Sequence, residues 1–447
     1  MKKSFLALAA ACSITAGAPA GAQSTNTPLG AAIASDYDAK LEALFIDFHQ
    51  NPELSYKETR TAAIIAREWR AAGWDVTEQV GGTGVVGVMT NGAGPTVLLR
   101  ADMDGLPVKE DSGLGYASTA RQVSIDGTEK PVMHACGHDV HITSIIGTAR
   151  RLSDMKAQWQ GTVVLIAQPA EERLGGARMM MEDGLYERFP KPDYALAFHV
   201  SSGAATGRLT LRESITYSSA DTVDIIVHGV GAHGASPHRG KDPILMGAQI
   251  IMNLQTLVSR DIAPLKPGVV TVGAFNSGFK HNIISDRATM QLTVRADDEE
   301  TRQKLLAGIR RVAENVGRMN GLPEDKLPKV LVSKESTPAT YNDVALTRRI
   351  RTLFEQRFGE EVFDDRPRGG MGAEDFAYFV APNTDVPGVY FGVGGTPQAD
   401  FDREKAGGTP VPSHHSPFFK VKPRESVTLG TEAMTAATLD LLAPTGN

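Results

Sequence analysis

The feature that most constrains this chain is an alternation of short apolar runs with amphipathic helical stretches. Runs bounded by Gly or Pro, such as Thr96–Arg100 and Thr162–Ala167, are typical of buried strands. Between them, His141–Leu152 has the apolar spacing of a helix. Repetition of this order predicts an α/β domain whose central sheet is mostly parallel and flanked by helices.

The pattern changes from about residue 205. A half-exposed strand is indicated at Ala288–Arg295, where apolar and polar residues alternate, and a charged amphipathic helix follows at Thr301–Met319. Between residue 205 and this strand, the pattern predicts a strand, a helix and a second strand, in that order. We therefore expect a small inserted α+β two-layer domain over 205–323, which divides the large domain into 23–204 and 324–447.

The first residues have the composition of a targeting segment. Lys2 and Lys3 precede the apolar stretch Phe5–Ile14, and small residues end at Ala22, which predicts a signal peptide over 1–22 and a periplasmic or secreted protein. A lipoprotein cysteine at Cys12 is the alternative. No later apolar stretch reaches the ~20 residues of a spanning helix, so no membrane span is expected.

Charge and cysteine usage narrow the function classes further. The chain has 46 Lys and Arg against 52 Asp and Glu, a formal net charge of −6, and no basic block interleaved with aromatic residues. Nucleic acid is therefore excluded as an expected partner.

Removal of Cys12 with the signal peptide would leave Cys136 as the single cysteine, without a disulfide partner in the same chain.

Chemistry-bearing residues gather where strands should end or helices begin. In open α/β sheets such positions converge on one crevice beyond the carboxyl ends of the strands. The segments concerned are Arg100–Pro107, His134–His141, Gln168–Glu172, His199 and Ser413–Pro417.

Thiolate and imidazole donors favour zinc over magnesium or calcium. Cys136 and His138, two residues apart around a glycine, can face one cavity. Further imidazoles and paired carboxylates exceed the needs of one tetrahedral ion, so a two-metal site is predicted. Of the adjacent Glu171 and Glu172, one carboxylate could bind metal while the other accepts a proton from water. Asp104 and Asp139 are candidates for orienting an imidazole.

Taken together, these segments resemble the N-acyl-amino-acid amidohydrolases of the hippurate hydrolase and auxin-conjugate hydrolase type, within a larger clan of dinuclear metallo-aminoacylases and carboxypeptidases. The resemblance extends from about Asp36 to the C-terminus. The matching motifs are Arg100–Pro107 (RADMDGLP), Met133–His138 (MHACGH), Gln168–Glu172 (QPAEE), Gly231–His238 (GAHGASPH), Asp242–Pro243, Gln255–Arg260 (QTLVSR), Met371–Phe376 (MGAEDF) and His415–Pro417 (HSP).

The resemblance implies a role for each matching residue. The general base is Glu171, His233 on the inserted domain approaches the substrate across the domain cleft, and Asn282 lies near the substrate carboxylate. Asp104 stands where the clan has its orienting Asp. The inserted domain is implied to be a lid that also mediates dimerisation. The implied metal ligands are Cys136, His138, Glu172, His199 and His415.

This chain departs from the family pattern at three places. Arg173 stands where Gly is usual, and Val230–Ala232 replaces a more usual Arg-Gly-Gly. Asp102 stands where the clan has a His, which weakens the transfer of a role to Asp104. His415 is preferred to His414 because the family motif ends in His-x-Pro. The first two departures bear on substrate preference.

The sequence therefore predicts a metal-dependent amidohydrolase that uses metal-activated water. Its expected substrate is a small N-acyl amino acid, or a short peptide, with a free carboxylate. Two divalent ions are expected, zinc favoured, with manganese, cobalt or nickel as alternatives. The competing hypotheses are an amidase that uses Cys136 as nucleophile and a binding protein that keeps the fold without turnover. A homo-oligomer, a dimer through the lid or larger, is also expected.

Overall fold

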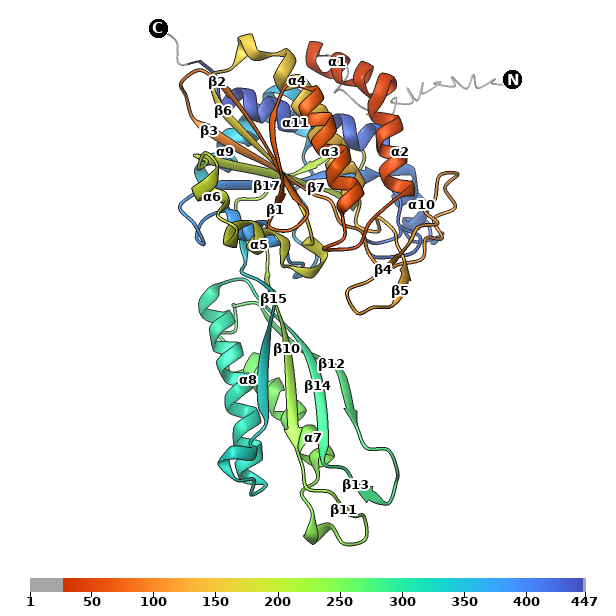
Figure 1. Ribbon diagram of the computed structural model, residues 1–447, viewed down its shortest axis with the longest axis vertical. Helices are drawn as coiled ribbons and strands as arrows, with labels where there is room; N and C mark the ends of the chain where they lie inside the picture. Colours follow the sequence, from red (N-terminus) through yellow and green to blue (C-terminus); the bar gives the residue numbers. More distant parts are fainter. Residues whose placement is uncertain (1–26, 445–447) are drawn as a thin grey trace, which may run out of the picture.

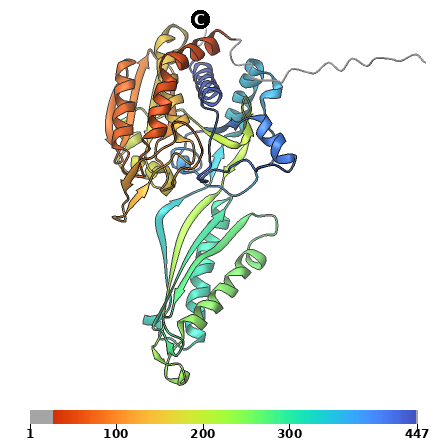
Figure 2. The ribbon, with the colours of Figure 1, turned by 90° about the vertical axis from the view of Figure 1, so that its right-hand side faces the viewer.

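The computed structural model describes residues 27–444 and shows two parts (Figures 1 and 2). A rounded sheet domain contains both ends of the described chain, and an elongated domain is inserted in its middle. The predicted signal peptide, residues 1–22, lies outside the described residues. Within residues 27–444, no helix combines the length and apolarity that crossing a membrane requires.

The large domain is built on a seven-stranded sheet whose four central strands are parallel, as predicted. Antiparallel strands flank them on both edges. In spatial order the strands are β1 (Asp75–Val80), β2 (Gly84–Asn91), β6 (Gly161–Gln168), β3 (Thr96–Asp102), β7 (Tyr194–Ala205), β17 (Gly388–Thr396) and β8 (Leu209–Thr210).

Helices cover both faces of this sheet. Leu98 and Leu99 on β3 illustrate the alternation, since Leu99 packs into the core beneath α2, α3, α4, α9 and α11, while Leu98 packs against α5 and α6. The helices of this domain are α1 (Pro28–Asp36), α2 (Glu42–Gln50), α3 (Thr59–Ala71), α4 (His138–Asp154), α5 (Gly176–Glu182), α6 (Leu185–Arg188), α9 (Val344–Phe358), α10 (Gln398–Lys405) and α11 (Pro423–Leu441). Two small sheets pair β4 (Arg121–Val123) with β5 (Glu129–Pro131) and β9 (Ser214–Tyr217) with β16 (Thr340–Asn342).

The inserted domain is a four-stranded antiparallel sheet with two helices packed on one face, the predicted two-layer arrangement. Its strands, in spatial order, are β12 (Gly268–Ser277), β14 (Arg287–Ala296), β10 (Ser219–His228) and β15 (Lys329–Thr337); its helices are α7 (Pro243–Thr256) and α8 (Glu299–Met319). At the end farthest from the large domain, β11 (Ala232–His233) pairs with β13 (Ile283–Ile284) (Figure 1). We call this end the tip.

The boundaries of the insertion differ from 205–323. Strand β8 at Leu209–Thr210 still belongs to the large sheet, and β15 pairs with β10 beyond the expected end. The sequence pattern missed β15 because it is an edge strand with lysine and glutamate along it, which keeps such edges from pairing with other chains. The sheet of the inserted domain therefore spans 219–337.

Candidate active site

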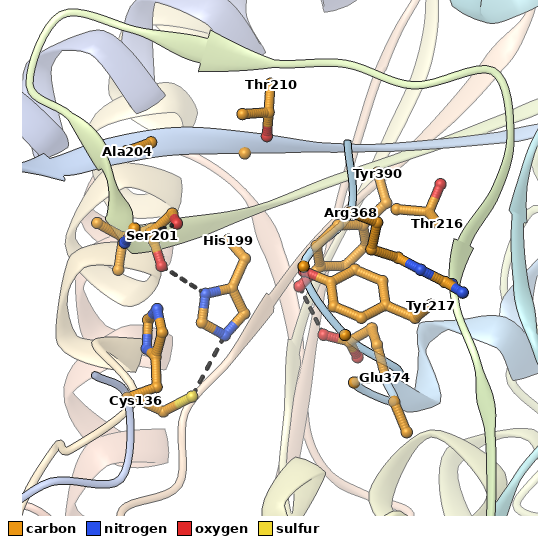
Figure 3. Close-up of a pocket in the computed structure, with 18 of the residues that line it drawn as sticks. Cys136, His199, Ser201, Ala204, Thr210, Thr216, Tyr217, Arg368, Glu374 and Tyr390 are labelled. Carbon is orange, nitrogen blue, oxygen red and sulfur yellow. Dashed lines mark hydrogen bonds between the residues drawn. The ribbon is translucent and has the colours of Figure 1, made fainter. Parts of the chain in front are cut away.

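The predicted segments converge on one cavity of about 720 Å³ beside the carboxyl ends of the parallel strands. Strand β6 leads into a 3₁₀ turn that contains Glu171 and Glu172, while His199 lies within β7. Cys136 lies just before α4. His415 comes from the loop between α10 and α11. All five side chains line the cavity, and Figure 3 shows Cys136 beside His199.

Two groups of possible ligand atoms share the Cys136 sulfur. Cys136 groups with His138 and His199, and separately with Glu172 and His415, the ligand atoms of each group lying within 4.8 Å of one another. The Cys136 Sγ lies 3.4 Å from His199 Nε2, and His415 Nε2 lies 3.4 Å from Glu172 Oε1. Donor atoms around a tetrahedral ion with bonds of ~2.0–2.3 Å are spaced at roughly 3.3–3.8 Å. The five residues predicted as ligands therefore lie at a spacing that fits metal ions.

The hydrogen bonds of His138, which is buried, and His199, which is half-buried, involve the Nδ1 of each ring. His138 Nδ1 lies 2.8 Å from the Asp104 carbonyl oxygen, and His199 Nδ1 lies 2.7 Å from the Val200 carbonyl oxygen. A carbonyl can only accept, so each Nδ1 carries a proton, and Nε2 is the nitrogen of each ring that could bind a metal ion. His138 Nε2 is buried without a hydrogen-bond partner among residues 27–444. This orphaned acceptor is what a metal ligand requires.

A glycine allows the cysteine turn to approach β7. Gly137 has φ +85°, and a Cβ at this position would lie 2.4 Å from Val200 Cγ1. Any larger residue would push the turn away from the strand that carries His199. The glycine of the MHACGH motif thus sets the distance between Cys136 and the β7 histidine.

Buried carboxylates hold the turn that carries the glutamate pair. Asp104 accepts backbone N–H bonds from Glu171 and Glu172, each at 3.1 Å, and an O–H bond from Ser55 at 2.6 Å. Glu58 accepts the N–H of Ala170 at 2.8 Å. Asp104 therefore contacts both the His138 ring, through its carbonyl, and the glutamate turn, through its carboxylate.

Sequence reasoning missed a fully buried charge network behind the cavity. Arg100 Nη1 donates to Asp102 Oδ2 at 2.5 Å, and Arg100 Nη2 donates to Glu374 Oε1 at 2.7 Å. Asp102 Oδ1 lies 2.5 Å from Nδ1 of His141, whose Nε2 accepts the Val200 N–H at 2.8 Å. Asp102, at the position of the clan's histidine, thus braces β7 next to His199. The signal was available, since Arg100 and Asp102 stand in RADMDGLP and Glu374 in MGAEDF.

Concentrated negative charge shifts the pKa values around the cavity. Burial of His138 favours its neutral form, yet the carboxylates of Asp102 and Asp104 outweigh burial and raise its pKa to about 10. Burial, with Glu374 and Glu172 nearby, raises the pKa of Glu171 well above its usual value. Burial and then Glu172 raise the pKa of the Cys136 thiol in the same way. A bound cation would offset this repulsion.

Asp139 does not orient a ligand imidazole, so that expectation is wrong. Its Oδ2 lies 2.7 Å from Nδ1 of His49, a buried residue on α2, and the Glu110 carboxylate lies 3.1 Å from the other nitrogen of His49. The reason is geometric. Asp139 is the residue after His138 on α4, and successive helical side chains point in different directions.

The structure does not bring His233 and Asn282 to the cavity of their own chain. Both lie at the tip, where the Gly234 N–H donates to the Asn282 carbonyl at 2.8 Å, and His233 is exposed. Strands β10 and β14 each have ten residues and separate the tip from the large domain by roughly 33 Å, at ~3.3 Å per residue. The cavity reaches Arg295 at the other end of β14. Rotation of the inserted domain as a rigid body about its attachment would keep the tip at this distance.

A Cys, His and Glu donor set at the strand ends of an α/β domain, with a second buried glutamate beside it, defines a metal-site hydrolase. The sequence agrees with this class. Residues 98–406 match the peptidase family M20/M25/M40, and the chain belongs to that family.

Relatives and a solved structure agree with this assignment. The chain is 37% identical over 345 residues to a hippurate hydrolase of Campylobacter jejuni, covering 77% of this chain and 86% of that protein. It is 36% identical over 374 residues to thermostable carboxypeptidase 2 of Saccharolobus solfataricus, and the match covers 83% of this chain and 88% of that protein. The solved structure of a dinuclear metal binding peptidase of the M20 family from Bacillus subtilis superposes with a TM-score of 0.72 at 27% identity. The match covers 92% of this chain and 99% of that protein.

This family membership makes the chain a hydrolase, so the reading as a binding protein without turnover is set aside. The hypothesis of a Cys136 nucleophile gains no support. A cysteine nucleophile needs a lowered thiol pKa, whereas burial raises that of Cys136.

Proposed function

We propose that this protein is a metal-dependent amidohydrolase that hydrolyses the amide bond of N-acyl amino acids, or releases the C-terminal residue of short peptides. The observation that carries the proposal is the pair of donor groups that share Cys136 next to a second glutamate. The names of the hippurate hydrolase and carboxypeptidase relatives support both substrate types.

The residues present fit two divalent ions. Cys136, His138 and His199 would hold one ion, and Cys136, Glu172 and His415 the other, so that the thiolate contributes to both. The thiolate favours zinc, with manganese, cobalt or nickel as alternatives. When bound, the ions would activate water and polarise the carbonyl of the scissile amide.

Glu171 is assigned the proton transfer. Its neighbour Glu172 would bind metal, which leaves Glu171 for the proton, and the Asp104 carboxylate fixes the backbone N–H groups of both residues. It would take the proton from water and give it to the departing amine.

We further propose a homodimer through the inserted domain, in which His233 and Asn282 of one copy serve the cavity of the other. Strand β12 is an edge strand, and the surface near it exposes large apolar side chains, including Met252 at 72% and Phe279 at 80% exposure. In the cavity of the other copy, His233 would donate to the developing oxyanion and Asn282 would contact the substrate carboxylate. Export to the periplasm or medium is proposed from the sequence of residues 1–22.

Metal removal and restoration test the function. The protein stripped by a chelator should lose hydrolysis of N-acyl amino acids, and zinc, manganese, cobalt or nickel should each be tried for recovery on a panel of acyl amino acids and dipeptides. Thiol alkylation of the metal-loaded protein is the matched control, because bound metal should protect Cys136. Undiminished turnover in the metal-free protein would reject the proposal.

A further inference from the structure

Four arginines line the cavity that contains the candidate metal centre. Arg295 lies on β14 of the inserted domain, Arg212 between β8 and β9, and Arg366 and Arg368 on the loop that follows α9. Figure 3 shows Arg368 on the side of the cavity lined by Tyr217 and Glu374, away from Cys136. The cavity thus contains both metal donors and guanidinium groups, and Arg368 lies on the side away from Cys136.

Some of this positive charge is already neutralised. Arg366 is paired with Asp364, at 2.8 Å from Nε to Oδ1, and also donates to the Gly203 carbonyl at 2.6 Å. The Glu374 carboxylate is occupied by Arg100 and by the Tyr390 hydroxyl, which donates at 2.5 Å. Glu374 is therefore not available to the other arginines.

Of the remaining three arginines, Arg368 is paired with one carboxylate through one nitrogen, whereas Arg212 and Arg295 have no ion-pair partner among the described residues. Arg368 donates from Nη2 to Asp297 at 2.5 Å, but its Nη1 is buried without a hydrogen-bond partner among residues 27–444. Arg212 donates only to the Arg366 carbonyl. Within the described chain neither Arg212 nor Arg295 has a carboxylate within 4.0 Å, and both side chains are partly buried.

Partly buried cations without partners are unfavourable, because water is lost and no anion replaces it. Burial lowers the pKa of Arg295, which shows the same desolvation, and Asp221 only partly opposes it. A substrate with a single carboxylate would neutralise one of these guanidinium groups and leave the others. A second anionic group on the substrate would be needed to satisfy them.

We infer that Arg212, Arg295 and Arg368 bind two carboxylates of one substrate, so that the preferred substrates are dicarboxylic N-acyl amino acids. This inference rests on the proposed hydrolysis of N-acyl amino acids. The second carboxylate has two chemical sources. It belongs either to an acidic amino acid, as in an N-acyl glutamate, or to a dicarboxylic acyl group, as in an N-succinyl amino acid.

Isosteric substrate pairs distinguish the two sources. N-acetylglutamate is compared with N-acetylglutamine, and N-succinylalanine with N-succinamoylalanine, on the zinc-loaded protein. In each pair only the charge changes. One pair should show kcat/KM at least ~10-fold higher for the acid, since exchanging a hydrogen bond between charged groups for a neutral one weakens binding by about this factor. Ratios near one in both pairs would overturn the inference.

Variants tie the preference to the residues. Arg368→Gln and Arg212→Gln should each bring the acid-to-amide ratio toward one. Arg366→Gln is the matched control, because Arg366 lies on the same wall but is already paired with Asp364, and the backbone carbonyl that accepts from Arg212 is kept. This control should keep the wild-type ratio. Melting temperatures within a few degrees of wild type establish that all three variants fold.

A binding measurement separates this inference from the proposed function. Calorimetry of glutamate against glutamine, and of succinate against succinamate, on the zinc-loaded protein requires no turnover. Binding preference for one dicarboxylate, lost in Arg368→Gln, would support the subsite even if no acyl amino acid were hydrolysed. Hydrolysis of monocarboxylate substrates with equal binding of acid and amide would refute the subsite and leave the proposed function intact.

Discussion

The cavity and the tip both contain residues that the sequence marks as functional, but the fold treats them differently. At the cavity, residues from Cys136 to His415 meet, and a buried carboxylate, that of Asp104, holds the glutamate turn in place. At the tip, His233 is exposed on a two-residue strand and faces no cavity of its own chain. The cavity is assembled by one chain, whereas the tip has a defined role only if a second copy meets it.

The largest effect is expected at the sulfur shared by both donor groups. Cys136→Ser replaces a thiolate with a neutral hydroxyl, so bound metal and activity should both be lost while the fold remains. Elemental analysis and circular dichroism measure this. The tip variant His233→Ala is the control and should keep full metal content. Wild-type metal content and turnover in Cys136→Ser would show that Cys136 is not a metal ligand.

Next in size is the separation of the two glutamates. Glu171→Gln should keep the metal and lower kcat by at least ~10²-fold, since it removes the proton acceptor. Glu172→Gln should instead reduce metal content, which metal titration would detect. If the two variants behaved the other way round, their roles would be exchanged.

The proposal that the tip of one copy acts in the cavity of another is tested by His233→Ala. Loss of one oxyanion donor should lower kcat by ~10²–10³-fold at unchanged metal content. Mixing this variant with Glu171→Gln should then restore activity, because a mixed dimer contains one cavity with both an intact Glu171 and an intact His233. Two inactive variants that stay inactive after subunit exchange, shown by sedimentation to be dimeric, would count against a tip that acts on the other copy.

A smaller effect is expected for Asn282→Ala. If Asn282 contacts the substrate carboxylate, this variant should lower kcat/KM for acids more than for their C-terminal amides. The ratio for a matched acid and amide pair is the measurement. His238, another tip residue, offers a control as His238→Ala. An unchanged ratio would leave Asn282 a structural residue of the tip.

The smallest effect concerns the contact between the two domains. Arg173, where the family usually has Gly, donates from Nε to Glu335 on β15 at 2.8 Å, and both side chains are more than a third exposed. Such pairs contribute ~0.2–1 kcal/mol. Arg173→Ala should therefore shift the urea midpoint slightly, and Glu335→Gln should shift it by a similar amount. A large shift in either would show that the pair controls how the domains are held.

Local patterns were sufficient for much of the fold. The predicted helix over 141–152 lies within α4, and the predicted strand over 162–167 lies within β6, because apolar periodicity acts within a few residues. The convergence of the candidate ligands on one cavity was equally predictable, since each lies near a strand end, at a helix start or in a loop at the same edge of the sheet. Strand β15 was missed because its exposed edge has little apolar signal.

The sequence by itself thus determined the order of strands and helices in the large domain and the candidate donor residues, but not strand β15. Only the tertiary structure decided which side chains meet across long separations. It paired Asp139 with His49 instead of a ligand, brought Arg212, Arg295 and Arg368 to the lining of one cavity, and set the tip roughly a sheet length away from that cavity. Periodicity reports which face of an element is buried, but the partner on that face depends on packing between segments that are hundreds of residues apart.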